Sequence, residues 1–289
     1  GPTACLFRAN TLRDPVADNG LPEIHDTKRL LNVGKSVPAQ ASIAAALELL
    51  AAAKAPVIVA GNGVRIAGAF DTLAKTAEML GAPVVTSILG KSAIAETHEL
   101  AAGPMGYTGL PFANEIVGMA DTILVVGCRL KPQDTCFEHP DMFDPSRQKI
   151  IQIDVDPRNA SWTIPADVAL AGDADETLRL FVDGLDGRID ADARDRRRKT
   201  FVELKSARAF FADPMRTSEA VPIIPQRLVA DINDTVPAEA IVCTDAGSNR
   251  HWMNHHFQAR RPGSYFGSGG LGGVSWSLPA TLCAKILYP

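Results

Sequence analysis

The sequence predicts an α/β protein whose larger part is a doubly wound, parallel β-sheet. Two observations indicate this class. Short apolar runs without polar alternation are typical of strands that are buried on both faces of a sheet. Helical patterns separate these runs, as expected where each parallel strand returns through a helix. A chain of 289 residues is long enough for more than one such unit.

The predicted elements of this sheet begin near residue 41. Ile43, Ala46, Leu47 and Leu50 recur at helical spacing, which predicts a first helix from Ala41 onward. Further elements alternate in type. Strands are expected at 56–60, 83–86, 122–126, 149–153 and 168–170, and helices at 67–80, 113–119 and 176–185. Residues 38–185 are therefore predicted to form one Rossmann-like domain.

Further segments flank this domain. Residues 186–222 are charged and helical and then rich in proline, which suits an interdomain linker. A helix at 226–232 and a strand at 240–243 open a second α/β unit, which we place at residues 223–289. This unit is smaller than a usual domain, so we expect it to be incomplete and to expose apolar faces.

Composition and charge argue against several classes of function. The net charge is −4 and the basic residues are mostly scattered, so nucleic acid is not an expected partner. The basic run at 194–199 is predicted to be the solvated face of a helix. No apolar segment is long enough to cross a membrane, and we expect no signal peptide. Five widely spaced cysteines without a CxxC pair indicate a reducing, cytoplasmic setting.

Several residues near predicted strand ends are candidates for binding a nucleotide. Residues 61–63 (Gly-Asn-Gly) follow a strand, but the full GxGxxG pattern is absent, so a plain tight turn is equally compatible. Arg129, Asp154 and Asp156 also follow strands, where ligands of parallel sheets bind. They could hold a pyrophosphate and a ribose, or form a salt-bridged loop cluster. The glycine-rich segment 103–109 could admit a flat ligand or be a surface loop.

The segment from residue 244 to the chain end contains a second candidate site. A strand there ends in residues 244–247 (Thr-Asp-Ala-Gly), and a glycine cluster at 269–273 precedes another helix. Such turns present backbone N–H groups to a phosphate. His251 and His255 would share one helix face, but the HExxH pattern is missing, so we expect no metal site on this chain.

Three segments of the central domain resemble thiamine-diphosphate enzymes of the acetolactate synthase family. They are residues 86–91 (Thr-Ser-Ile-Leu-Gly-Lys), 98–106 and 151–157. In members that contain flavin, the matching segments line an FAD site, whereas other members bind ADP or nothing there. The resemblance therefore implies a possible contact with FAD or ADP for a set of residues: Thr86, Leu89, Gly103, Gly106, Arg129 and Asp154.

The second unit resembles the cofactor domain of the same enzymes. By this resemblance, Gly247, Ser248 and Asn249 meet the diphosphate of thiamine diphosphate. The glycines of the later cluster allow close approach of the backbone to the cofactor, and the apolar residue of that cluster supports the bent thiamine. The residues at these positions are Gly270, Gly272, Gly273 and Val274. Family members more often carry Met or Leu where this chain has Val274.

The resemblance also implies parts that this sequence does not contain. In the family, the activating glutamate comes from a preceding pyrimidine-binding domain, of which residues 1–37 would be a tail and linker. The family holds Mg²⁺ through a Gly-Asp-Gly segment that does not occur here. We therefore expect this chain alone to be inactive. Active sites of the family lie at dimer interfaces, which implies a homodimer or homotetramer.

The resemblance implies a carboligase that acts on 2-keto acids, as acetolactate synthase does. The substrate would lose CO₂, and the acyl carbanion would be transferred to a second carbonyl group. Residues 261–266 look more like the benzoylformate decarboxylase branch, so a simple 2-keto acid decarboxylase is an alternative. Another alternative is a non-catalytic fragment that binds a nucleotide or serves assembly.

Overall fold

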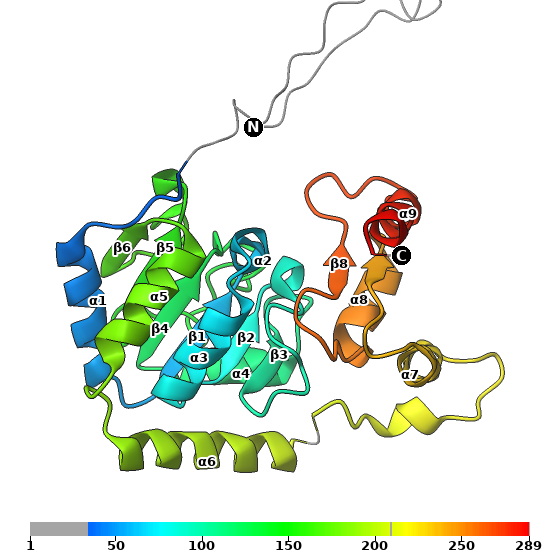
Figure 1. Cartoon of the computed structure of the whole chain (residues 1–289). Coiled ribbons are helices and arrows are strands. Elements are labelled where there is room, and N and C mark those ends of the chain that lie inside the picture. The colour runs from blue at the N-terminus through cyan, green and yellow to red at the C-terminus, as the bar shows by residue number, and fades with distance from the viewer. Residues whose placement is uncertain (1–33, 209, 289) are drawn as a thin grey trace, which may run out of the picture. The chain divides into compact units, whose positions relative to one another are not determined.

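The computed structural model describes residues 34–208 and 210–288. The described chain forms a six-stranded parallel sheet and a second, two-stranded parallel sheet (Figure 1). The predicted α/β class with a Rossmann-like sheet is therefore confirmed. The expected tail of a preceding domain lies almost wholly outside the described residues. The domain boundaries at 38–185, 186–222 and 223–289 stay predictions.

The large sheet has the strand order β3-β2-β1-β4-β5-β6, which is that of a doubly wound dinucleotide fold. Its strands are β1 (Pro56–Ala60), β2 (Val84–Thr86), β3 (Ala101–Pro104), β4 (Thr122–Val126), β5 (Lys149–Asp154) and β6 (Val168–Ala171). The chain direction across the sheet reverses between β1 and β4, which pair from Pro56 opposite Thr122 to Ala60 opposite Val126. Ligands of such folds bind beyond the carboxyl ends of the strands at this point.

Helices cover the sheet because its central strands are buried on both faces. Every residue of β1 and β4 is buried. The helices of this part are α1 (Gln40–Ala52), α2 (Asn62–Ala67), α3 (Phe70–Leu80), α4 (Pro111–Met119) and α5 (Ala174–Leu185). Figure 1 shows α1, α5 and α3 side by side on one face. The Asp173 carboxylate caps α5 by accepting hydrogen bonds from the N–H groups of Asp175 and Glu176.

Two elements differ from the sequence-based expectation. The helix expected at 67–80 begins at Phe70 as α3, and a separate short helix, α2, ends at Ala67, because the chain turns at Gly68 with a left-handed φ of 69°. The segment 103–109, expected to be a loop, begins inside strand β3. Gly103 has a left-handed φ of 84°, which favours glycine at this position. None of the described helices is long and apolar enough to cross a membrane.

The remaining elements follow the large sheet in the chain. They are α6 (Ala191–Ala207), the 3₁₀ turn η6 (Pro214–Thr217), α7 (Pro225–Thr235), β7 (Val242–Thr244), α8 (Ser248–His256), β8 (Tyr265–Gly267) and α9 (Ser277–Leu287). Two further 3₁₀ turns, η4 (Ile88–Gly90) and η5 (Pro157–Asn159), follow β2 and β5 within the large-sheet part. A small core forms here around Val229, Met253, Phe257 and Tyr265. Helix α9 buries none of its residues, and Leu278, Leu282 and Ile286 form an exposed apolar stripe.

Candidate functional site

A cavity of about 350 Å³ lies at the carboxyl edge of the large sheet, where the strand order reverses. Its walls come from the turns after β1, β2, β4, β5 and β6. Three of the residues predicted to contact FAD or ADP line it, namely Leu89, Arg129 and Asp154. Parallel topology explains this convergence, because the ends of neighbouring parallel strands meet at one edge.

The cavity lining contains an arginine without a partner among the described residues and an aspartate whose carboxylate already accepts hydrogen bonds. Arg129 is exposed and forms no hydrogen bond or ion pair with any described residue, and Lys131 lies beside it on the lining. The Asp154 carboxylate accepts from the Asp156 N–H at 2.9 Å and from Asn159 Nδ2 at 3.0 Å. One cationic side chain is thus available to an anionic ligand. Asp154 holds the loop after β5 through Oδ1 alone, and its Oδ2 forms no hydrogen bond with a described residue.

Asp156 forms a salt bridge in the loop after β5, which is one of the two alternatives that the sequence left open for this residue. Its carboxylate pairs with Arg158 at 2.7 Å, and this hydrogen bond lowers the pKa of Asp156 to about 2. The partner is Arg158 and not Arg129. The loop cluster therefore includes Asp156 but leaves Arg129 outside it.

Asp134 is a cavity residue that the sequence did not suggest. Its side chain is only 5% exposed, and burial raises the pKa of this carboxyl group. The Cys128 thiol lies 4.0 Å from it, and burial raises the pKa of that thiol to about 12. The cavity thus has a buried acidic group at its wall that is easier to protonate than an ordinary aspartate. A polar residue in a loop gives no local signal of such burial.

Three other predicted nucleotide contacts do not line the cavity. Thr86 lies inside β2 and is 1% exposed, and its buried Oγ1 has no hydrogen-bond partner in the described part of the chain. Gly103 lies in β3, as described above. Gly106 donates its N–H to Asn114 Oδ1 at 2.8 Å, and a side chain there would stand 2.6 Å from the Gln133 carbonyl oxygen. Their contact with a nucleotide stays a prediction.

The Gly-Asn-Gly turn after β1 has a structural reason for its glycines. The Gly63 N–H donates to the Gly127 carbonyl at 2.9 Å. A Cβ at Gly61 would stand 2.1 Å from that same oxygen, which is closer than any side chain allows. This turn and the end of β4 are therefore in direct backbone contact, and the plain-turn interpretation explains the motif without a ligand.

The second candidate site is the turn at 244–247 that leads into α8. No side chain caps this helix, and Gly247 has φ 100° and ψ −168°, a conformation that glycine alone adopts readily. A Cβ at Gly247 would meet nothing within 4 Å, and Ser248 and Asn249 are exposed. The first N–H groups of α8 therefore face open space, as an anion-binding helix end requires.

A second helix begins at the same turn. The two carboxylate oxygens of Asp245 each accept at 2.9 Å from Ser277, one from its N–H and one from its hydroxyl group. Ser277 is the first residue of α9, so Asp245 holds the start of that helix beside the start of α8. The glycine cluster also reaches this turn, because a Cβ at Gly272 would stand 3.0 Å from Ala246 Cβ. The structure thus brings together the two segments assigned to the cofactor.

The rest of the glycine cluster is open. Side chains at Gly270 and Gly273 would meet no atom within 4 Å, and both residues are exposed. Val274 is 97% exposed and touches no core. A side chain that supports a bound cofactor is covered by that cofactor alone, so the exposure of Val274 does not test this role. The role of Val274 stays a prediction.

The donor set of this site fits a diphosphate, because the N–H groups at the start of α8 have no side-chain cap. Within the described residues, no group of three or more His, Cys, Asp or Glu side chains could hold a metal ion. The histidines of α8 have other contacts. His255 Nε2 lies 3.0 Å from the Thr108 carbonyl oxygen, and the His256 ring stacks on Trp252.

Arg65 joins the two candidate sites, a role that no sequence motif indicated. Its guanidinium donates to the carbonyl of Leu89 and to the carbonyl of Tyr265, both at 2.9 Å. It also lies 4.5 Å from the centre of the Phe266 ring. Leu89 lines the cavity, while Tyr265 and Phe266 belong to β8, which leads into the glycine cluster. One side chain thus fixes both segments.

Comparison with protein families agrees with the two sites. Residues 43–181 match the central domain of thiamine pyrophosphate enzymes. Residues 245–289 match the C-terminal thiamine pyrophosphate binding domain of these enzymes. Thiamine pyrophosphate is another name for thiamine diphosphate. The first match contains the cavity, and the second contains the turn before α8 and the glycine cluster.

Individual curated relatives of this chain carry the names of enzymes. A probable acetolactate synthase large subunit of Methanococcus aeolicus is 34% identical over 254 residues, which cover 84% of this chain and 42% of the relative. A sulfoacetaldehyde acetyltransferase of Roseovarius nubinhibens is 33% identical over 290 residues, covering 95% and 47%. A probable 2-ketoarginine decarboxylase of Pseudomonas aeruginosa is 32% identical over 258 residues, covering 89% and 43%.

The chain spans less than half the length of these curated relatives. Over that length it carries both matched regions in the order in which the sequence predicted them. The chain therefore belongs to the thiamine pyrophosphate enzymes.

Proposed function

We propose that the chain is part of a thiamine-diphosphate-dependent carboligase that acts on a 2-keto acid, as acetolactate synthase does. When bound, thiamine diphosphate supplies a nucleophilic carbon and stabilises the negative charge left by loss of CO₂. The acyl carbanion equivalent is then transferred to a second carbonyl group. The active site is completed by Mg²⁺ and by an acidic residue from outside this chain. Assembly as a homodimer or homotetramer is part of the proposal.

The observation that carries this proposal is the convergence of two helix starts on the turn at 244–247. The N–H groups at the start of α8 are uncapped, and Asp245 holds the start of α9 next to them. The uncapped start of α8 carries partial positive charge, which favours a diphosphate, whereas the start of α9 is already paired with the Asp245 carboxylate. Gly247 leaves room for it, since no atom lies where a side chain would stand.

The relatives support carboligation as the reaction. Acetolactate synthase is named for a product with two joined carbon units and sulfoacetaldehyde acetyltransferase for the transfer of an acetyl group, and each is about one-third identical to this chain over the matched residues. A 2-keto acid decarboxylase is the second candidate, favoured by the similarity to the probable 2-ketoarginine decarboxylase. In the carboligase the acyl group is transferred to a second carbonyl compound, whereas in the decarboxylase the carbanion is protonated.

We also propose that the cavity at the carboxyl edge binds the ADP portion of FAD, or ADP itself. Its volume of about 350 Å³ is within the range of cofactor pockets. Arg129 is free of partners among the described residues and is available to the pyrophosphate. Asp154 lies at the end of the neighbouring strand β5, where a ribose hydroxyl group could donate to it.

The reaction is tested with the protein expressed from its whole reading frame. With pyruvate, thiamine diphosphate and Mg²⁺, we expect release of CO₂ together with a carboligated product that mass spectrometry detects. Release of CO₂ with free aldehyde as the only product would replace the carboligase with the decarboxylase. Absence of CO₂ release from any 2-keto acid tested, with cofactor present, would contradict both.

Gly247→Ala is expected to raise the thiamine diphosphate concentration needed for half-maximal activity at least tenfold. Alanine at this φ and ψ is strained by about 1–3 kcal/mol. The backbone at residue 247 is therefore expected to change conformation, which points the N–H groups of α8 away from the diphosphate. Cofactor titration of the activity measures the change. The matched control is Gly187→Ala, where φ is 68° and no atom lies within 4 Å of the new Cβ. An equal effect of both substitutions would contradict the placement of the diphosphate.

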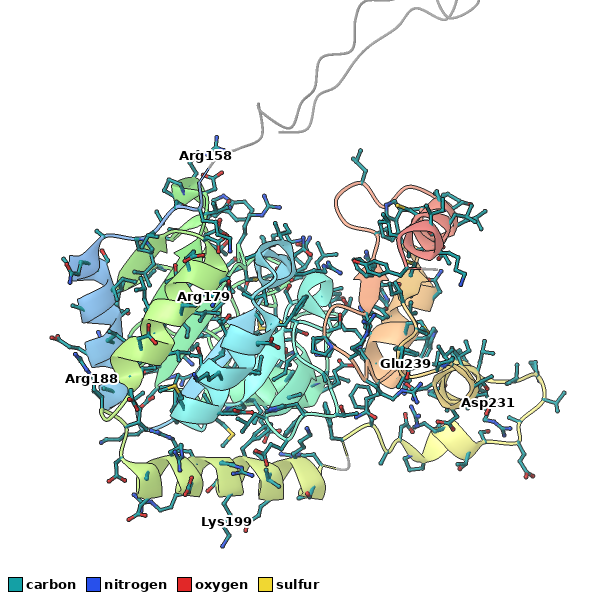
Figure 2. All side chains as sticks on the ribbon, in the orientation of Figure 1. Arg158, Arg179, Arg188, Lys199, Asp231 and Glu239 are labelled. Atoms are coloured by element: carbon teal, nitrogen blue, oxygen red, sulfur yellow. The ribbon has the colours of Figure 1, made fainter. Side chains whose placement is uncertain are left out.

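Arg129→Met is expected to weaken binding of ADP to the chain about tenfold or more. A hydrogen bond to a charged group contributes about 1.5–3 kcal/mol, and no other described residue pairs with Arg129. Isothermal titration calorimetry with ADP provides the measurement. Arg188→Met removes an exposed arginine at the end of α5, labelled in Figure 2, and should leave the affinity unchanged. Equal affinity of wild type and Arg129→Met would exclude Arg129 from the site.

A further inference from the structure

Arg250 lies in the first turn of α8, directly after the residues assigned to the diphosphate of the cofactor. It is the third residue of this helix and is half-buried. Asn254 follows one turn later on the same face of α8 and is fully buried, so this face packs inward. The Cα–Cβ bonds of a helix tilt toward its amino end, which directs Arg250 to the end where the N–H groups are uncapped.

The Arg250 guanidinium lies at the carboxyl edge of the small sheet. Its terminal nitrogen Nη1 donates to the Ser268 carbonyl oxygen at 2.8 Å. A Cβ at Gly267, the last residue of β8, would stand 3.7 Å from Arg250 Cδ and 3.7 Å from Thr244 Oγ1. Because β7 and β8 are parallel, their two ends and the turn at 244–247 share one edge. Ligands of parallel α/β sheets bind beyond this edge.

The positive charge of Arg250 has no acidic partner in the part of the chain that the structure describes. Its one hydrogen bond there goes to a backbone carbonyl oxygen and not to a carboxylate. The acidic residue of the neighbouring turn, Asp245, accepts from Ser277 with both of its oxygens. The buried carboxylate of Glu96 is paired with Lys91. A half-buried charge without a counter-charge is costly, and a bound anion offsets that cost.

One nitrogen of Arg250 is available to an anion. Nη1 is bonded to Ser268 and Nε is shielded from solvent, so neither of them can take a ligand. Nη2 forms no hydrogen bond with a described residue and, unlike Nε, is not shielded from solvent. Ser268 therefore holds the guanidinium in place while Nη2 remains open. A hydrogen bond from this nitrogen to an anion would be charge-assisted, and such bonds are stronger than neutral ones.

The other lysine and arginine residues between positions 240 and 288 lie elsewhere. Arg260 donates to backbone carbonyl oxygens near the end of α7. Arg261 precedes the amino end of β8, which is at the opposite edge of the small sheet from the turn. Lys285 lies in the last turn of α9. Within this stretch, Arg250 is therefore the strongly basic side chain at the cofactor edge.

We propose that Arg250 binds the diphosphate of thiamine diphosphate through Nη2. This inference rests on the proposed function and adds a side chain to the backbone N–H groups at the start of α8. Those N–H groups carry only partial charge, whereas Arg250 places a full positive charge beside them. The contact also involves the glycine cluster, because the carbonyl group that holds the guanidinium belongs to Ser268, directly before Gly269.

The test measures binding of thiamine diphosphate in the presence of Mg²⁺, by isothermal titration calorimetry of the protein expressed from its whole reading frame. Arg250→Met is expected to weaken this binding about tenfold or more, because a charge-assisted hydrogen bond is lost. Equal affinity of wild type and Arg250→Met would overturn the role of Arg250 and leave the proposed function standing. Absence of binding to the wild type would overturn both.

Two further variants separate the charge of Arg250 from its contact with Ser268. Arg250→Lys keeps the positive charge and should bind thiamine diphosphate within about threefold of wild type. Equal weakening by Arg250→Lys and Arg250→Met would assign the loss to the contact with Ser268 and overturn the proposal. Arg261→Met removes an exposed positive charge from the opposite edge of the small sheet and should bind as wild type does. Weakening by Arg261→Met as large as that by Arg250→Met would show attraction to the overall charge and would also overturn the proposal.

Discussion

The position of the cofactor-binding segment depends on a salt bridge that is fully buried. The Lys91 ammonium lies 2.6 Å and 2.7 Å from the carboxylate oxygens of Glu96, and both residues are 1% exposed. One Glu96 oxygen also accepts from the Ala259 N–H at 2.7 Å, and Lys91 donates to the Asn254 carbonyl at 3.3 Å. Leaving one buried charge without its partner costs about 3–5 kcal/mol. The pair therefore ties the segment around α8 and β8 to the loop after η4.

The same loop region connects the two candidate sites. Leu89, in η4, lines the nucleotide cavity, and its side chain would stand 3.1 Å from a Cβ at Gly269, the first residue of the glycine cluster. Arg65 bonds both to this turn and to β8. Ser92 continues the contact, because its hydroxyl group accepts from the Tyr265 N–H at 3.1 Å. The nucleotide cavity and the turn at 244–247 are thus held by one connected set of residues, whose polar groups are largely hydrogen-bonded to one another.

The sequence predicted the parts of the structure that depend on the local pattern of residues. Strands β1 and β4 were predicted with their observed bounds because continuous apolar runs mark strands that are buried on both faces. Strand β3 was missed, since Ala-Ala-Gly-Pro has low strand propensity and is fixed by pairing with β2. Arg129 and Asp154 were placed near one another by parallel topology alone. Lys91 and Glu96 could not be identified, because their partners Asn254 and Ala259 are more than 160 residues away in sequence.

Amide hydrogen exchange in Glu96→Gln tests the central role of the buried pair most directly. Glutamine can still accept from the Ala259 N–H, but it leaves the Lys91 ammonium unpaired. The account predicts that exchange of the Ala259 and Tyr265 amides accelerates about a hundredfold, while amides of β4 keep their wild-type rates. The control Glu99→Gln removes an exposed partner of Arg198 and should change neither group of amides. Unchanged exchange at Ala259 and Tyr265, or equal acceleration throughout β4, would contradict the account.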